Sequence, residues 1–350
     1  MSTKIKRYLA VLIRTRFGLD LPKAGLINYA KHYFVKRKPL IDPKHLSPIL
    51  MCIGITDRCN LNCPWCAKVR PFNSAGLEMH DPDMKPEVVE RFLNTEIAKR
   101  LLIVTFMGGE PLLNENIGDM IRIVKRRRLL CAIITNGLLL ADKISILLDA
   151  GLDEVQMSIH DHNNAYETLR KIIPPISKKI PIHATYVLTK TILHNDQEHL
   201  HKIIQYAVEM GCSSFRFNIC VPETIGGSIN ETIFDDDTVY QDFIKKQSKI
   251  KTGIPIYYPS PIKRHVNGIH DKNCRFPWQR LQINNRGDCS MCCYFLYAEN
   301  KKNFLSGDAM ETYNHPVLQD IRTKLLARNN VVGPYCNHCL HLVKSYTTKI

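Results

Sequence analysis

The stretch Cys59-Asn60-Leu61-Asn62-Cys63-Pro64-Trp65-Cys66 follows an apolar run from Ile49 to Ile55, and the rest of the chain is interpreted around it. Its three thiols, separated by three and then two residues, can converge on one metal centre, but they are one ligand short of a structural zinc site or a complete iron-sulfur cluster. An open coordination position distinguishes reactive metal sites from structural ones. The spacing therefore predicts a reactive iron-sulfur centre, with a zinc loop or a disulfide pair as the alternatives.

The remaining cysteines indicate metal chemistry as well. The chain of 350 residues holds 13 cysteines, an odd number, and most of them lie between 59 and 66 or between 274 and 339. Grouped thiols favour metal ligation in a reducing compartment over a disulfide framework. The hydrophobic content of 45% suits a globular protein with one large and one smaller domain, and no apolar run has the length of a transmembrane helix or a secretory signal. We therefore expect a cytoplasmic protein.

Residues 1–47 are predicted to be a basic extension ahead of the cysteine motif. Apolar residues from Ile5 to Phe17 recur at the spacing of one helical face, and ten basic residues within positions 1–40 stand against Asp20 alone. The whole chain has a formal net charge of +15. Such a helix predicts contact with an anionic membrane surface or another polyanion such as RNA, and packing against the protein's own core is the alternative.

Short β-like apolar runs alternate with amphipathic helical stretches from about residue 49 to 220. This alternation predicts an α/β fold with a parallel sheet and right-handed crossovers. A partial barrel and a flat doubly wound sheet are both compatible with the order. The predicted strands are 49–55, 101–106, 131–135, 154–159, 181–188 and 214–219, and the clearest predicted helices are 85–98, 116–127, 142–150 and 196–210.

Polar and glycine-rich motifs lie at the ends of three predicted strands, where parallel α/β folds collect their chemistry. Met107-Gly108-Gly109-Glu110-Pro111 follows the second strand. Its glycines let the backbone approach a ligand, and Glu110 and nearby carbonyl oxygens are acceptors for an ammonium group. Asn136 follows the third strand and Ser158 lies near the end of the fourth. Ordinary turn and strand-end roles are the alternatives for all of these residues.

Together these motifs resemble the signature of the radical S-adenosylmethionine (radical SAM) enzymes. The resemblance rests on Cys59-x3-Cys63-x2-Cys66 and on Gly108-Gly109-Glu110 one βα unit later. It implies a partial (βα)6 TIM-like barrel, open on one side, whose three cysteines hold a four-iron four-sulfur cluster. It further implies that the open iron binds SAM, that the Gly-Gly-Glu motif binds the amino group of SAM, and that a 5'-deoxyadenosyl radical abstracts hydrogen from a substrate.

The same resemblance implies SAM contacts for Trp65, Asn136 and Ser158. The match at the fourth strand is imperfect, because the family's Ser-x-Asp-Gly reads Ser158-Ile159-His160-Asp161 in this chain. The departure leaves open whether His160 or Asp161 touches the cofactor. Arg170 is a candidate partner for the SAM carboxylate, with a surface arginine as the alternative.

The second cysteine group resembles the SPASM extension of radical SAM enzymes in its shortened form, the twitch domain. Cys274-x12-Gly287-x4-Cys292 precedes Cys336-x2-Cys339, and the resemblance implies that these four cysteines hold an auxiliary four-iron four-sulfur cluster in a small α+β domain. Zinc held by the same cysteines is the alternative. Strand-like runs at 281–283 and 289–295 flank a hairpin turn at 284–288, and a helix is predicted over 316–327.

The sequence thus predicts a basic extension (1–47), a radical SAM core (48–225), a connection (226–273) with one helix at 236–249, and a twitch-like domain (274–350). The predicted function is that of a radical SAM oxidoreductase, in which the auxiliary cluster takes the second electron of a two-electron oxidation of an unidentified substrate. Modification of a peptide or protein is the first alternative, and a non-catalytic zinc or iron-sulfur protein attached to RNA or membrane is the second. The resemblance also implies an electron donor such as flavodoxin or ferredoxin.

Overall fold

The computed structural model describes residues 21–34, 47–64, 66, 82–161, 165–220, 229–247, 250–259, 261–262, 276–285, 287–290, 302–303 and 313–326. The predictions for the helical stretch 5–17, for Trp65 and for Cys274, Cys292, Cys336 and Cys339 lie outside these residues.

The described strands form one ten-stranded sheet in the order β10-β9-β8-β1-β2-β3-β4-β5-β6-β7. Strands β1 to β6 are parallel and adjacent in chain order, as successive right-handed βα units require. β7 adds to β6 and β8 adds to β1, both in parallel. The strands are β1 (Leu50–Gly54), β2 (Ile103–Met107), β3 (Leu130–Thr135), β4 (Glu154–Ile159), β5 (Ile182–Leu188), β6 (Ser214–Ile219), β7 (Ile256–Tyr257), β8 (Arg280–Ile283), β9 (Asp288–Ser290) and β10 (Lys302–Asn303).

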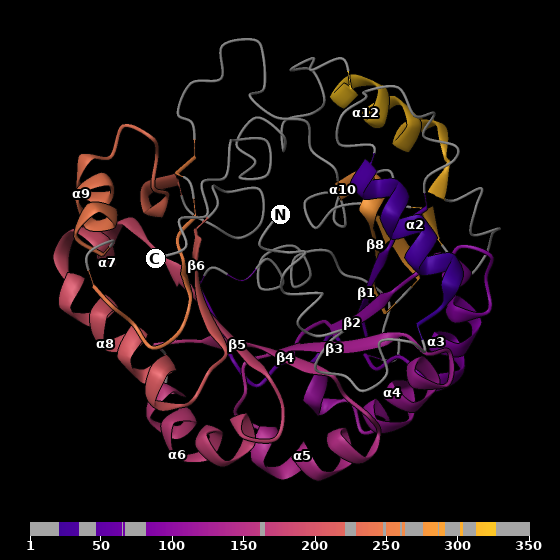
Figure 1. Cartoon of the computed structure of the whole chain (residues 1–350), viewed down its shortest axis with the longest axis horizontal. Coiled ribbons are helices and arrows are strands. Elements are labelled where there is room, and N and C mark those ends of the chain that lie inside the picture. The colour runs from indigo at the N-terminus through magenta and orange to yellow at the C-terminus, as the bar shows by residue number, and fades with distance from the viewer. Residues whose placement is uncertain are drawn as a thin grey trace.

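This order identifies a partial barrel. A doubly wound sheet reverses its strand order at a switch point within the βα units and carries helices on both faces. Here β1 to β7 follow one another in chain order, and the helices lie along the outer side of a curved sheet (Figure 1). The predicted partial barrel is therefore confirmed. The helices along the outer side are α3 (Pro86–Leu93), α4 (Ile117–Arg126), α5 (Leu140–Asp149), α6 (Ala165–Ser177) and α8 (Gln197–Glu209).

Burial separates the two faces of the sheet. Along β5 the residues Ile182, Ala184, Tyr186 and Leu188 are buried, and the alternating residues from His183 to Val187 are only half-buried. Since side chains alternate across a strand, the buried set faces the helices and the half-buried set faces the hollow of the barrel. α4 completes this outer core with four buried apolar side chains at helical spacing, Ile117, Met120, Ile121 and Val124.

The hollow side of the sheet is polar. Strand register aligns Ser158 with Thr185, Thr185 with Arg216, and Arg216 with Tyr257, so one row of polar side chains crosses β4, β5, β6 and β7. The hydroxyl oxygens of Ser158 and Thr185 are 3.4 Å apart, and the Arg216 guanidinium lies 5.0 Å from the centre of the Tyr257 ring. The inside of the barrel can therefore contact a polar molecule.

Part of the predicted extension packs on the barrel. Helix α2 (Lys23–Phe34) was not anticipated from the sequence. Its buried Asn28 donates from Nδ2 to the carbonyl oxygens of Ser47 at 3.0 Å, Pro48 at 3.2 Å and Arg100 at 3.1 Å. These contacts tie the helix to the start of β1 and to the turn before β2. Among the described residues, no helix is both long and apolar enough to cross a membrane.

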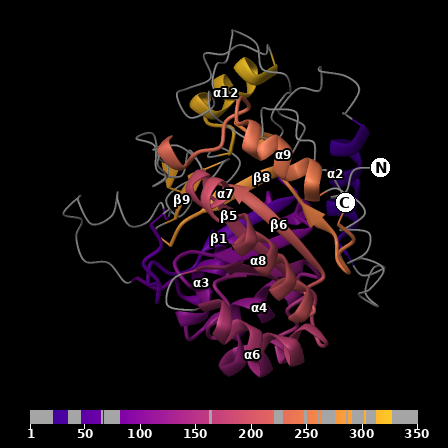
Figure 2. The ribbon, with the colours of Figure 1, turned by 90° about the vertical axis from the view of Figure 1, so that its left-hand side faces the viewer.

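The described part of the C-terminal region contains the predicted hairpin. β8 and β9 pair antiparallel, with Ile283 opposite Cys289, and Gly287 has a φ of 84° in the turn. β8 also extends the barrel sheet through its pairing with β1. The other described helices are α7 (Lys190–Asn195), α9 (Thr238–Gln247), α10 (Phe276–Gln279) and α12 (Pro316–Leu326), and Figure 2 shows α12 at the opposite end of the molecule from α6.

Candidate metal and cofactor site

The three cysteines of the motif follow the carboxyl end of β1. Cys59 is exposed, whereas Cys63 and Cys66 are half-buried, and the Cys66 N–H donates to the Cys63 carbonyl oxygen at 3.0 Å. Burial raises the pKa of the Cys63 thiol to about 11, and repulsion from the Cys66 and Cys59 thiolates adds to the shift. The Cys63 sulfur is therefore close enough to those of Cys59 and Cys66 to be affected by their charge, and bound iron would offset that charge.

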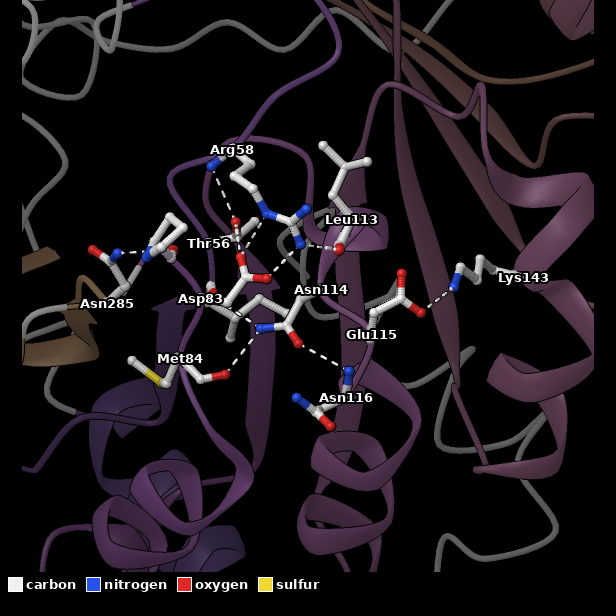
Figure 3. A network of polar contacts seen from close by, with 12 residues as sticks. Thr56, Arg58, Asp83, Met84, Leu113, Asn114, Glu115, Asn116, Lys143 and Asn285 are labelled. Atoms are coloured by element: carbon white, nitrogen blue, oxygen red, sulfur yellow. Dashed lines mark hydrogen bonds and ion pairs between the residues drawn. The ribbon is translucent and has the colours of Figure 1, made fainter. Parts of the chain in front are cut away.

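The segment that leads into the first cysteine is braced by Asp83. Its carboxylate accepts a hydrogen bond from the Thr56 hydroxyl at 2.5 Å. It also forms a bidentate ion pair with the Arg58 guanidinium (Figure 3). Arg58 also donates to the Leu113 carbonyl oxygen at 2.5 Å. These contacts fix the residue that immediately precedes Cys59.

A buried asparagine supports the same segment from below. Asn114 donates from Nδ2 to the carbonyl oxygens of Ile55 at 2.9 Å and Met84 at 3.0 Å, and it accepts from the Asn116 N–H at 2.9 Å (Figure 3). The side chain is fully buried. It therefore joins the end of β1, the segment before α3 and the start of α4 at one point.

The predicted glycine pair lies directly against the cysteine segment. The Gly109 N–H donates to the Thr56 carbonyl oxygen and the Glu110 N–H to the Arg58 carbonyl oxygen, both at 2.8 Å. A Cβ at Gly108 would overlap the Thr56 carbonyl oxygen, and a Cβ at Gly109 would overlap that of Arg58. Gly108 also has a φ of 142°, which other residues rarely adopt. Only glycine lets these two backbones meet.

Glu110, which the sequence offers as an acceptor for an ammonium group, has hydrogen-bond partners within the protein. Its carboxylate is buried and accepts hydrogen bonds from the Leu112 N–H at 3.0 Å, the Thr135 hydroxyl at 2.7 Å and the Asn136 N–H at 2.8 Å. Burial raises the pKa of Glu110, although these three hydrogen bonds oppose the shift. The carboxylate thus joins the ends of β2 and β3, and its role in contacting an ammonium group stays a prediction.

Asn136 connects the end of β3 to the cysteine loop. It donates from Nδ2 to the Asn60 side-chain oxygen at 2.7 Å, and its own side-chain oxygen accepts from the Leu138 N–H at 3.1 Å. Asn60 lies between the first two cysteines, so this contact positions the loop itself. The turn role considered from the sequence is present, together with a link to the loop that the sequence did not reveal.

The end of β4 also reaches the cysteine loop. His160 Nδ1 lies 3.8 Å from Cys63 Sγ. Asp161 is turned toward the outer layer, where it accepts hydrogen bonds from the Tyr186 hydroxyl at 2.5 Å and from His199 Nε2 at 2.8 Å. Ser158 is half-buried on the hollow side, and its contact with SAM stays a prediction. Of the two residues in doubt, His160 is therefore the one that faces the predicted cluster.

Arg170 is not brought to this site. It lies on α6, pairs with Glu209 at 2.8 Å and Glu167 at 3.5 Å, and stacks 4.3 Å above the Tyr206 ring. These partners belong to the outer helices α6 and α8. Arg170 is therefore a surface arginine, which was the alternative considered from the sequence.

The residues around the cysteines fit an iron-sulfur cluster. The three sulfur donors lie on one loop after the carboxyl end of β1, and hydrogen bonds to Arg58, Asn60 and Glu110 connect this segment to β2 and β3. The described side chains contain no group of three His, Cys, Asp or Glu gathered around a single-ion position. In a four-iron cluster each cysteine binds a different iron, so the ligands surround a larger body than one ion. Arg58, Asp83 and Asn114 complete the site, and the only sequence signal for them was the adjacency of Arg58 to Cys59.

Comparison with known proteins agrees with this arrangement. The model of the radical SAM superfamily matches residues 53–224. The chain is 27% identical over 180 residues to a PqqA peptide cyclase of Granulibacter bethesdensis, covering 47% of this chain and 46% of that one. It is 33% identical over 122 residues to a GTP 3',8-cyclase of Aliarcobacter butzleri, covering 34% and 36%. The matches thus span less than half the length of these two relatives.

A longer match and two solved structures extend the comparison. A probable GTP 3',8-cyclase of Methanococcus aeolicus is 25% identical over 298 residues, covering 84% of this chain and 81% of that one. Streptococcus suis SuiB bound to its precursor peptide SuiA has a TM-score of 0.63 at 17% identity, over 85% of this chain and 71% of SuiB. BtrN in complex with AdoMet and 2-DOIA has a TM-score of 0.51 at 12% identity, over 83% and 92%. These structures show that the fold is shared.

Proposed function

We propose that the protein is an enzyme that holds a four-iron four-sulfur cluster on Cys59, Cys63 and Cys66 and uses it with SAM. The match of residues 53–224 to the radical SAM superfamily supports this proposal. The observation that carries the proposal is the contact between the cysteine segment and the Gly-Gly-Glu turn, where the Gly109 and Glu110 N–H groups donate to Thr56 and Arg58. When bound, the cluster supplies the electron that cleaves SAM to the 5'-deoxyadenosyl radical.

The protein's own residues position these groups. Gly108 and Gly109 bring backbone carbonyl oxygens to the edge of the cysteine loop, where they can accept hydrogen bonds from the amino group of SAM. Glu110 helps to fix the position of the two glycines, because its carboxylate accepts three hydrogen bonds from groups within the protein. Trp65 and Ser158 complete the SAM pocket in this proposal, and Asn136 holds the cysteine loop that forms its wall.

The substrate would bind in the polar hollow of the barrel. Arg216 and Tyr257 lie on β6 and β7, beyond the positions proposed for SAM, and Asn218 is an exposed residue on the same side of β6. A molecule held there would have its reacting hydrogen between these strands and the carboxyl end of β4. Substrates with several hydrogen-bonding groups suit this surface better than apolar ones.

The chemistry we favour is a two-electron oxidation. Cys274, Cys292, Cys336 and Cys339 would hold a second four-iron four-sulfur cluster, which would accept the electron left on the substrate after hydrogen abstraction. A cluster with four protein ligands has no open position for substrate, which suits electron transfer. A flavodoxin or ferredoxin would reduce the first cluster, and a reducing cytoplasm would keep all of these thiols available.

Modification of a peptide is the second candidate. It is favoured by the 27% identity to a PqqA peptide cyclase, a radical SAM relative whose name states a peptide substrate. Mass spectrometry separates the candidates, because peptide modification changes the mass of a peptide encoded near the gene, whereas small-molecule oxidation leaves every peptide unchanged.

Anaerobic reconstitution tests the proposal as a whole. The wild-type protein should bind about eight irons per chain with two clusters and about four if the C-terminal cysteines hold zinc. Incubation with SAM and dithionite should yield 5'-deoxyadenosine, and Cys63→Ala should abolish it. Cys212→Ala, which alters a buried thiol away from the loop, is the matched control. A colourless wild-type protein that forms no 5'-deoxyadenosine would refute the proposal.

The proposed membrane or polyanion contact requires a separate test. Because α2 is tied to the barrel through Asn28, a chain that begins at Leu21 keeps the residues that make that contact. We expect the full chain to co-sediment with anionic liposomes and the shortened chain to do so much less. Equal co-sedimentation of both would exclude the N-terminal stretch as the membrane-binding element.

A further inference from the structure

One histidine contacts the cysteine loop from outside the motif. His160 Nδ1 is 3.8 Å from Cys63 Sγ, within reach of an N–H to sulfur hydrogen bond. His160 directly follows β4, which ends at Ile159, whereas Cys63 belongs to the loop after β1. This contact therefore spans the mouth of the barrel. It also lies at the position where the chain departs from the family's Ser-x-Asp-Gly pattern.

The next residue holds His160 in place. Asp161 accepts from the Tyr186 hydroxyl on β5 at 2.5 Å and from His199 Nε2 on α8 at 2.8 Å. Tyr186 is buried, and burial together with the Asp161 charge raises its pKa, so its hydroxyl stays a donor. With both carboxylate oxygens engaged by separate elements, the backbone at 160–161 has little freedom to turn His160 away from Cys63.

We propose that His160 donates a hydrogen bond from Nδ1 to the Cys63 sulfur of the loaded enzyme and thereby raises the reduction potential of the cluster. This rests on the proposed function, since it requires the cluster on Cys59, Cys63 and Cys66. Reduction adds negative charge to the cluster and its sulfurs, and a donor aimed at a sulfur stabilises the more negative state. His160 is thus a positioning residue that makes the first electron transfer easier.

The test is a redox titration of the reconstituted full-length protein, followed by electron paramagnetic resonance. Only the cluster with an open iron should change its signal when SAM is added, so that signal identifies the relevant cluster. His160→Ala should make reduction about tenfold less favourable, which corresponds to a shift of about 59 mV to more negative potential for one electron. His160→Asn keeps an amide N–H near the position of Nδ1 and should stay close to the wild-type potential.

Two further variants separate tuning from a general loss of structure. Tyr186→Phe removes one of the two contacts to Asp161 and should shift the potential in the same direction by less than His160→Ala does. His194→Ala removes a histidine that pairs with Asp237 on the outer layer and should leave the potential unchanged. Iron content and the thermal unfolding midpoint of each variant report whether cluster and fold are retained.

The possible outcomes test the role of His160 separately from the proposed radical SAM function. A wild-type potential in His160→Ala, with iron and 5'-deoxyadenosine formation retained, would overturn the role of His160 and leave the proposed function standing. Failure of His160→Ala to take up iron, with the wild-type unfolding midpoint retained, would show that His160 is needed to hold the cluster rather than to adjust its potential, and would overturn the inference as well. A wild-type protein without a SAM-responsive cluster would refute both.

Discussion

The Glu110 N–H donates to the Arg58 carbonyl oxygen at 2.8 Å, so the residue after the glycine pair is bonded to the residue before the first cysteine. The motif after β2 and the motif after β1 are therefore parts of one structure. The glycines are required first for the approach of two protein backbones and only then for the approach of a ligand. A substitution in either motif should therefore alter the backbone position of the other.

Replacing Gly109 tests this directly. A Cβ at this position would overlap the Arg58 carbonyl oxygen, which is backbone and cannot swing aside. We expect Gly109→Ala to destabilise the protein by about 1–3 kcal/mol, as overpacking usually does, and to lower iron retention several-fold. Denaturant unfolding and iron analysis measure the two effects. Gly253→Ala is the control, because a Cβ there would lie 3.8 Å from Val208, at ordinary contact distance; equal behaviour of the two variants would contradict the packing argument.

The buried Glu110 should give the apoprotein a distinctive pH dependence. Its pKa is raised above the ordinary value of 4.5, so the folded state binds this proton more tightly than the unfolded state does. Stability contributed by this group is then full below the unfolded pKa and falls as the pH rises toward the folded pKa. Glu110→Gln carries no such proton. The unfolding free energy of wild type minus that of Glu110→Gln should decline in urea titrations as the pH rises above 4.5, and an increase with pH would show that hydrogen bonding outweighs burial.

The Asp83 brace should matter more for the loop than for the fold. Asp83→Ala removes the contacts from Thr56 and Arg58, yet the Arg58 and Asp83 side chains are 44% and 23% exposed, so solvent weakens the ion pair. We expect a loss of about 1 kcal/mol in unfolding free energy and a faster loss of iron to a chelator. The exposed pair of Asp119 and Arg122 on α4 offers a matched control, and Asp119→Ala should change neither measurement. If Asp83→Ala lost iron to the chelator at the wild-type rate, the contacts of Asp83 would not contribute to holding the cysteine loop.

Thiol alkylation should sort the cysteines by environment. Cys59 is exposed and should react first with iodoacetamide in the folded apoprotein. Burial raises the pKa of Cys212 to about 12 and that of Cys131 still further, so both should stay unmodified until the protein unfolds. Peptide mapping of the labelled protein measures this order, and iron reconstitution should protect Cys59. Early labelling of Cys131 or Cys212 would mean that the barrel opens far more readily than its packing implies.

Local patterns predicted the barrel well because its signals are local. The limits of β4 and β6 agree with the predicted 154–159 and 214–219 to the residue, since each strand has buried apolar residues at alternating positions. Contacts between segments that are far apart in the sequence were harder to predict. The sequence offers Glu110 as an acceptor but does not show that Thr135 and Asn136 engage it, and the pairing of Arg58 with Asp83 crosses 25 positions.

The resemblance to the radical SAM enzymes predicted the chemistry of the site, but it did not predict the contacts that hold the cysteine loop in place. His160 was noticed only because it departs from the expected pattern, and its orientation toward Cys63 follows from the partners of Asp161, which lie on β5 and α8. Nothing near residue 160 in the sequence specifies those partners. Arg170 shows the converse, because a plausible charge for SAM is engaged by Glu209 on a neighbouring helix.

The pairing of β1 with β8 has a consequence for synthesis. Leu50 aligns with Arg280, 230 residues later, so the first strand of the sheet keeps one edge uncovered until most of the polypeptide has left the ribosome. During that interval its N–H and C=O groups along this edge are a template for strands of other nascent molecules. Expression should therefore benefit from slow translation or chaperone capacity early on, and polypeptides ending before residue 276 should accumulate as aggregates.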